Sequence, residues 1–139
     1  MNLETDYVTE IGMIFAIIAT LIFIVNCIFQ LLIVIGLPLG HLSYGGKYDR
    51  QKLPNKLRIT SVIAITIFSF ATITYLEFAG LITILNNPNF TLIYCWIIAI
   101  YLTLGVLMNA ASKSKWEKRI WTPITLLNAI SCYIVLLLS

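Results

Sequence analysis

Four long apolar segments alternate with shorter polar segments along the chain. The apolar segments are residues 11–37, 59–85, 90–111 and 120–138. Each reaches or approaches the roughly 20 residues that a helix needs to cross about 30 Å of hydrocarbon. Backbone groups in lipid must be hydrogen-bonded within the segment, and uninterrupted runs of this length do not fit the alternating strands of a membrane barrel. The pattern therefore predicts four transmembrane helices.

The polar segments predict how these helices are connected. Residues 38–58 and 112–119 form two loops, and Asn86–Asn89 is a tight turn in which Pro88 ends one helix and starts the next. Short connections make consecutive helices antiparallel neighbours. We therefore expect an all-α membrane protein, a four-helix up-down bundle in which residues 1–139 form a single transmembrane domain.

The composition agrees with a lipid environment. Hydrophobic residues make up 60% of the 139 residues and charged residues 11%, with a mean hydropathy of +0.94. A soluble domain has about 25% charged residues. The net charge is +3, but the basic residues flank hydrophobic segments instead of forming a face of their own. Nucleic acid is therefore not an expected partner. Tryptophans near the expected interfaces, among them Trp116 and Trp121, fit the aromatic belt of membrane proteins.

The basic residues predict an orientation. Five of the nine lie between the first and second apolar segments and four between the third and fourth: Lys47, Arg50, Lys52, Lys56, Arg58, Lys113, Lys115, Lys118 and Arg119. Lys and Arg mark the cytoplasmic side of a membrane protein. Loops 38–58 and 112–119 are thus expected in the cytoplasm and both termini outside. Glu4, Asp6 and Glu10 precede the first segment where a signal peptide would be basic, so we expect a retained span.

Polar side chains inside the apolar segments are candidates for function, because such groups normally face the interior of a bundle. Asn26 and Gln30 share one helical face, and Asn128 is expected at a similar depth. These amides predict one of two arrangements. They form an adhesive network between helices, or they form the polar floor of a cavity that opens towards Asn109 and His41.

Glu77 is the one acidic residue expected well inside a span. It could couple transport to protons or cations, or it could reach the outer surface or pair across an oligomer. His41 is the only histidine and lies in the first loop. It is interpreted either as an interfacial side chain bonded to the backbone or as a proton-responsive or ligand-contacting group. Cys27, Cys95 and Cys132 have no CxxC spacing and are expected to act as small apolar side chains.

The stretch GLPLGHLSYGGKYDRQKLPNKLRITS, from Gly36 to Ser61, resembles a group of small bacterial membrane proteins of unknown function. Members of that group have a G-x-P-x-G elbow, a following Gly–Gly pair, then Leu–Pro and an Arg that opens the second span. Residues 109–123, NAASKSKWEKRIWTP, resemble their second cytoplasmic turn. The resemblance implies a four-span protein of the bacterial inner membrane, and it supplies no activity, cofactor or catalytic residue.

Three functions are compatible with these features. The expected one is a non-enzymatic bundle that binds or stabilises another membrane component. The first alternative is a small transporter or homo-oligomeric channel that uses Glu77 and the amides. The second is a membrane enzyme acting on lipid or quinone, which would need converging catalytic groups, whereas Glu77 and His41 are expected at opposite faces. We expect no catalytic residue, cofactor or metal. The expected partners are the lipid bilayer and either a second copy of this chain or another membrane protein.

Overall fold

The computed structural model describes residues 3–138 and contains four long helices. They are α1 (Leu3–Ile35), α2 (Asn55–Phe78), α3 (Pro88–Ala110) and α4 (Lys115–Leu138), and two short 3-10 helices, η1 (Gly40–Leu42) and η2 (Tyr44–Gly46), lie between α1 and α2. Each long helix is long and apolar enough to cross a membrane. The expected all-α four-helix bundle is confirmed.

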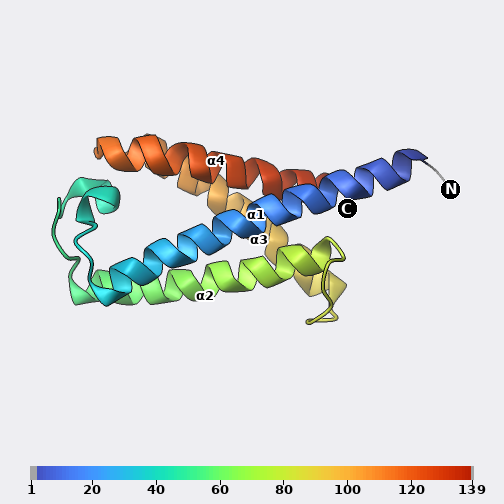
Figure 1. Ribbon diagram of the computed structural model, residues 1–139, viewed down its shortest axis with the longest axis horizontal. Coiled ribbons are helices and arrows are strands. Elements are labelled where there is room, and N and C mark those ends of the chain that lie inside the picture. Colours follow the sequence, from blue (N-terminus) through green and yellow to red (C-terminus); the bar gives the residue numbers. More distant parts are fainter. Residues whose placement is uncertain (1–2, 139) are drawn as a thin grey trace.

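Consecutive helices run antiparallel, and two of the three connections between them, residues 36–54 and 111–114, lie at one end of the bundle (Figure 1). We call residues 36–54 the elbow. The end formed by the elbow and residues 111–114 is called the basic end, because all nine Lys and Arg residues lie in these connections or in the first turns of α2 and α4. The start of α1 and the end of α4 lie at the opposite end (Figure 1).

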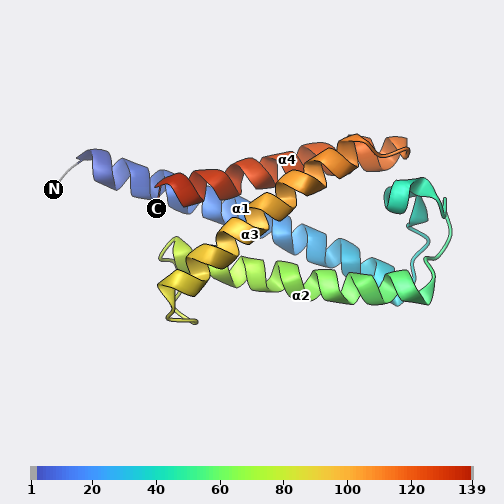
Figure 2. The ribbon, with the colours of Figure 1, turned by 180° about the vertical axis from the view of Figure 1, so that it is seen from behind.

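The four helices do not pack equally closely. α1 packs extensively against α2 and α4, and α3 packs against α4, but α2 and α3 contact each other much less. Figure 2 shows the reason: α2 and α3 lie close at the end away from the elbow and diverge towards the basic end. The bundle is therefore closed at one end and splayed at the other.

α2 ends at Phe78, well before the limit near residue 85 that the apolar pattern predicts. The N–H of Gly80 donates to Glu77 O at 2.9 Å and the N–H of Leu81 donates to Leu76 O at 2.9 Å, which is the paired geometry of a Schellman helix end. Gly80 has φ +74°, a conformation that glycine adopts without steric cost. Residues 79–87 are consequently a loop, although most of them are apolar.

Local capping accounts for the starts of α3 and α4. α4 begins at Lys115, before the expected start near residue 120, because the Ser114 hydroxyl accepts a hydrogen bond of 3.2 Å from Glu117 N. α3 begins at Pro88, where the Asn87 side chain accepts from Phe90 N at 3.1 Å. α1 also extends beyond its expected start near residue 11.

The closed part of the bundle holds a dense core. Small residues with no exposed surface line the helix contacts, among them Ala16 and Ala19 on α1, Ala71 on α2 and Ala99 on α3. Such residues let helix backbones approach closely in a membrane. Larger side chains fill the centre, and the buried Tyr75 hydroxyl donates to Cys95 O at 2.7 Å. This core lies in the middle of the bundle and in the half away from the elbow.

Candidate functional site

A pocket of about 540 Å³ occupies the half of the bundle next to the basic end. All four long helices and the elbow contribute to its lining. It begins at Phe68 and Leu102, where the dense core stops, and continues past Ala64 on α2 and Gly105 on α3 as those helices diverge. Ligand pockets in proteins measure about 300–1,000 Å³, so the volume is sufficient for a small molecule or part of a lipid.

The four amide side chains singled out from the sequence all line this pocket: Asn26, Gln30, Asn109 and Asn128. They do not form the adhesive network, because among the described residues no hydrogen bond joins one of them to another. Asn26 Nδ2 donates to Ile22 O at 3.0 Å, within its own helix. Asn109 Nδ2 donates to Thr125 Oγ1 at 3.1 Å. The amides instead belong to the lining of one cavity, which includes Asn109 but not His41.

Asn128 is the most unusual of these amides. It is fully buried, and its Nδ2 has no hydrogen-bond partner in the described part of the chain. Its Oδ1 receives only a weak contact of 3.9 Å from Cys132 Sγ. A buried donor without a partner costs about 1–3 kcal/mol. The NH₂ group of Asn128 therefore has unused capacity to donate a hydrogen bond, and it lies just beneath the pocket surface, because Asn128 belongs to the lining but has no exposed surface.

The elbow covers the pocket at the basic end. Leu42, Ser43, Tyr44 and Gly45 belong to the lining. Three hydrogen bonds hold the elbow against α4, and each joins residues more than 70 positions apart: Ser114 Oγ to His41 O at 2.7 Å, Trp121 Nε1 to Leu42 O at 2.9 Å, and Gly45 N to Glu117 Oε2 at 2.9 Å. The elbow is thus a folded cover and more than a connection between spans.

Sequence reasoning missed the α4 side of this contact. Ser114 and Glu117 have the spacing of a capping box, and that signal could have identified them. In the structure the Glu117 carboxylate accepts from Gly45 N in the elbow, and the Ser112 hydroxyl donates to the same oxygen. Trp121 was expected in an interfacial belt, but it is buried and its ring lies 4.5 Å from that of Phe29. No local signal distinguishes it from an interfacial tryptophan.

His41 lies in η1, beside the pocket cover and outside the pocket lining. The expected bond between its imidazole and the backbone is not found among the described residues, and instead its main-chain carbonyl accepts from Ser114 Oγ. Its Nδ1 is buried and has no partner among the described residues. The neighbouring Leu42 and Ser43 reach the pocket, whereas the His41 side chain does not.

Glu77 lies in the last turn of α2, at the end of the bundle away from the amides. Its carboxylate binds three main-chain N–H groups of the following loop. Oε2 accepts from Ile84 at 2.8 Å and from Leu85 at 2.6 Å, and Oε1 accepts from Asn86 at 2.9 Å. The structure therefore separates Glu77 from Asn26, Gln30, Asn109, Asn128 and His41, and its contacts are those of a loop anchor.

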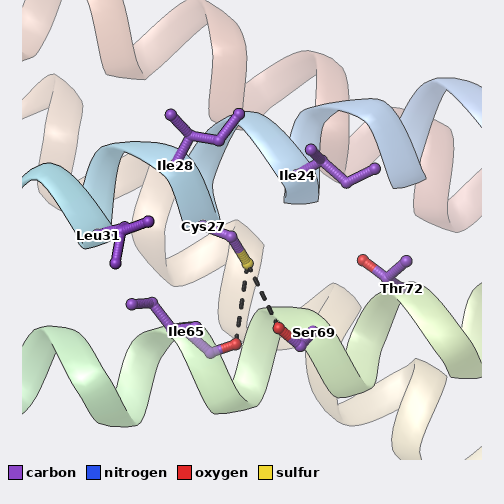
Figure 3. A pocket seen from close by; sticks show the side chains of 7 residues that line it. All are labelled: Ile24, Cys27, Ile28, Leu31, Ile65, Ser69 and Thr72. Atoms are coloured by element: carbon purple, nitrogen blue, oxygen red, sulfur yellow. Dashed lines mark hydrogen bonds between the residues drawn. The ribbon is translucent and has the colours of Figure 1, made fainter.

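A second, smaller hollow of about 300 Å³ lies on the surface between α1 and α2. Figure 3 shows aliphatic side chains around its mouth and the Cys27 thiol at the helix contact. Cys27 Sγ lies 3.8 Å from Ile65 O and 3.7 Å from Ser69 Oγ. Cys27 fills space between two helices, as the sequence interpretation expects of a small apolar side chain.

Neither a metal-binding cluster in residues 3–138 nor a similar protein indicates the chemistry of the pocket. Among the described residues, no group of three or more His, Cys, Asp and Glu side chains is placed to hold a metal ion. Neither a protein-family model, nor a curated protein, nor a solved structure matches this chain. The pocket, its amides and its cover are the features on which a function can be based.

Proposed function

We propose that this small multi-pass membrane protein is a non-enzymatic binding protein, and that it takes another membrane component into the pocket at its basic end. The pocket itself carries the proposal: about 540 Å³ in a short bundle, with four amides on an otherwise largely apolar wall. Binding pockets are typically apolar with a few polar groups that orient the ligand. A bundle that served only as a spacer would gain nothing from keeping such a volume open.

The divergence of α2 and α3 supports entry from within the bilayer. Tyr101, Leu104 and Met108 line the pocket from α3 and are also exposed, with Met108 74% exposed. These side chains therefore connect the pocket with the lipid-facing surface. A component dissolved in the membrane would enter between α2 and α3 without crossing water.

The remainder of the bundle favours binding over transport. Within the described residues, the half away from the elbow is filled by side chains with no exposed surface, among them Phe23, Tyr75 and Val135. Glu77, the residue on which a transport function would depend, is engaged by three main-chain N–H groups at that far end. His41 lies at the basic end, so these two ionisable groups lie at opposite ends of the bundle and support no shared catalytic step.

We further propose that the basic end faces the cytoplasm of a bacterial inner membrane, with both termini outside. The clustering of all nine basic residues at one end of the fold supports this orientation. The resemblance of the elbow and of residues 109–123 to small bacterial four-span proteins supports the same location. We propose that the chain belongs with that group.

Native mass spectrometry with two phenylalanine variants on α2 tests the binding function. Ala64 lines the pocket, whereas the adjacent Ile63 is 56% exposed and lies outside the lining. Protein released from mild detergent is expected to carry a bound membrane component in the wild type and in Ile63→Phe, but not in Ala64→Phe, whose ring would occupy part of the cavity and obstruct the ligand. Retention of the same component by folded Ala64→Phe, or its absence from the wild type, would contradict the proposal.

A further inference from the structure

We infer that the pocket takes an uncharged amphiphile from the bilayer whose polar group accepts hydrogen bonds, such as an ester or ketone carbonyl, and that the Asn128 amide binds this group. The inference rests on the proposed binding function and names the class of molecule bound. It follows from the donors, the charges and the apolar walls of the pocket.

Two buried polar atoms of the pocket lining have no partner among the described residues, Asn128 Nδ2 and Ser43 Oγ. The Ser43 hydroxyl can either donate or accept, so Asn128 is the residue that restricts the polar group of the ligand. Asn26 and Asn109 each already use one N–H of their Nδ2 in a hydrogen bond, to Ile22 O and to Thr125 Oγ1. Asn128 is fully buried and its Nδ2 has no partner among the described residues. An NH₂ group can be satisfied only by an acceptor. A ligand that supplied one would remove the cost of an unpaired buried donor.

The charges around the pocket argue against an ionic headgroup. Within residues 3–138, no Lys or Arg belongs to its lining, so an anionic group would be desolvated without a cationic partner. Glu117 is the only carboxylate in that lining, and its Oε2 already accepts from Gly45 N and from the Ser112 hydroxyl. An uncharged polar group meets no such electrostatic penalty.

The apolar walls account for the rest of the ligand. Phe29 and Ile33 on α1, Phe68 on α2, and Leu102 and Met108 on α3 line the space between Asn128 and the diverging helices. An amphiphile would therefore place its acceptor at Asn128 and its chain along these side chains towards the bilayer. A polar donor at one end and apolar side chains towards the bilayer form the pattern expected for a lipid-like molecule that enters the pocket from within the membrane.

Trp121 provides a reporter for the test, because it lines the pocket and is only 9% exposed. Replacing Trp96 and Trp116, the other two tryptophans, with phenylalanine leaves Trp121 as the single indole. Three probes with one brominated chain are then titrated in detergent: a monoacylglycerol, which is uncharged with an ester carbonyl, the corresponding fatty-acid anion, and the corresponding hydrocarbon. Bromine quenches an indole only at close contact, so quenching of buried Trp121 reports occupancy of the pocket.

We expect saturable quenching by the monoacylglycerol. The hydrocarbon should bind about tenfold more weakly, the effect of one hydrogen bond to a buried donor. The anion should also bind more weakly, because its charge would be desolvated without a cationic partner. Asn128→Leu should reduce monoacylglycerol affinity by a similar factor and leave the hydrocarbon unaffected. Thr122→Val is the matched control, because Thr122 Oγ1 is also buried and unpaired on α4 but Thr122 lies outside the lining. The comparison of the three probes on the unsubstituted pocket does not depend on the folding of any Asn128 variant.

The outcomes separate the two proposals. Equal affinity for the ester and the hydrocarbon, tighter binding of the anion, or unchanged ester affinity in folded Asn128→Leu would overturn the ligand class while leaving the pocket a binding site. Failure of every probe to quench Trp121 would instead overturn the binding function itself.

Discussion

Trp121 on α4 donates a hydrogen bond from its indole Nε1 to the main-chain carbonyl of Leu42 in the elbow, at 2.9 Å. The two residues are 79 positions apart in the sequence. This bond joins the first loop to the fourth helix directly at the cover of the pocket. The indole also packs on Phe29 of α1, with ring centroids 4.5 Å apart. The Trp121 side chain thus connects the elbow, which covers the pocket, with α1 and α4, which line it.

Trp121→Phe should lower the free energy of unfolding in detergent by roughly 1 kcal/mol, because the phenylalanine ring keeps the aromatic contact but leaves the Leu42 carbonyl without its donor. Chemical or thermal unfolding of the purified protein measures the change. Trp116→Phe is the control, since Trp116 is 53% exposed and should be nearly neutral. Equal stability of the two variants would show that the elbow is not held by this bond.

Two glycine-to-alanine substitutions should have opposite effects on stability. Gly80 has φ +74°, and no atom lies within 4 Å of the place that an alanine Cβ would take, so Gly80→Ala adds only backbone strain, which costs about 1–2 kcal/mol. Gly105 is inside α3, and an added Cβ would lie at ordinary contact distance, 3.4 Å, from Thr125 Cγ2. Gly105→Ala should stabilise the helix by about 0.5–1 kcal/mol. Thermal unfolding of both variants measures the changes in stability. A stable Gly80→Ala variant would refute the assignment of the α2 end, and a destabilised Gly105→Ala variant would refute the contact predicted between α3 and Thr125.

Glu77→Gln should loosen the loop after α2 without changing ligand binding. A glutamine side chain has one acceptor oxygen, so it cannot accept from Ile84, Leu85 and Asn86 together as the carboxylate does. Hydrogen–deuterium exchange at residues 84–86 should become severalfold faster. Glu10→Gln, on the exposed surface of α1, is the control. If hydrogen–deuterium exchange of the loop is unchanged but ligand binding or ion flux is lost, Glu77 has a functional role and is not only a loop anchor.

Cysteine labelling tests the proposed orientation. Lys47→Cys and Lys113→Cys, both exposed at the basic end, should react with a membrane-impermeant maleimide only from the cytoplasmic side. Asn89→Cys, exposed at the opposite end, should react only from outside. A Cys27→Ala background removes the one native thiol that is not fully buried. Positions 47 and 113 labelled from different sides of the bilayer would be incompatible with the fold.

The bundle and the shared depth of the amides were predictable because both depend on local periodicity. Runs of apolar residues determine that a segment is a membrane helix, and counting residues along a helix determines how deep a side chain lies. Asn26 and Asn128 could therefore be assigned to one level of the bundle before any contact was known.

The features that were not predictable depend on contacts between distant residues. Residues 79–85 are mostly apolar, and their hydropathy cannot reveal that Gly80 ends α2 or that Glu77 binds the loop. The contact of Glu117 with Gly45 likewise exists only once the elbow folds back on α4. The sequence left open whether Asn128 bonds to amides on α1 or lies at a cavity, because the divergence of α2 and α3 that leaves a pocket there has no local signal.

The most direct measurement is a crystal structure of the protein grown from phospholipid bicelles. The account predicts a non-protein molecule in the pocket between α2 and α3, with an acceptor atom within hydrogen-bond distance of Asn128 Nδ2. A bundle in which α2 and α3 close over an empty or filled-in space, with the Asn128 amide bonded to another side chain, would contradict it.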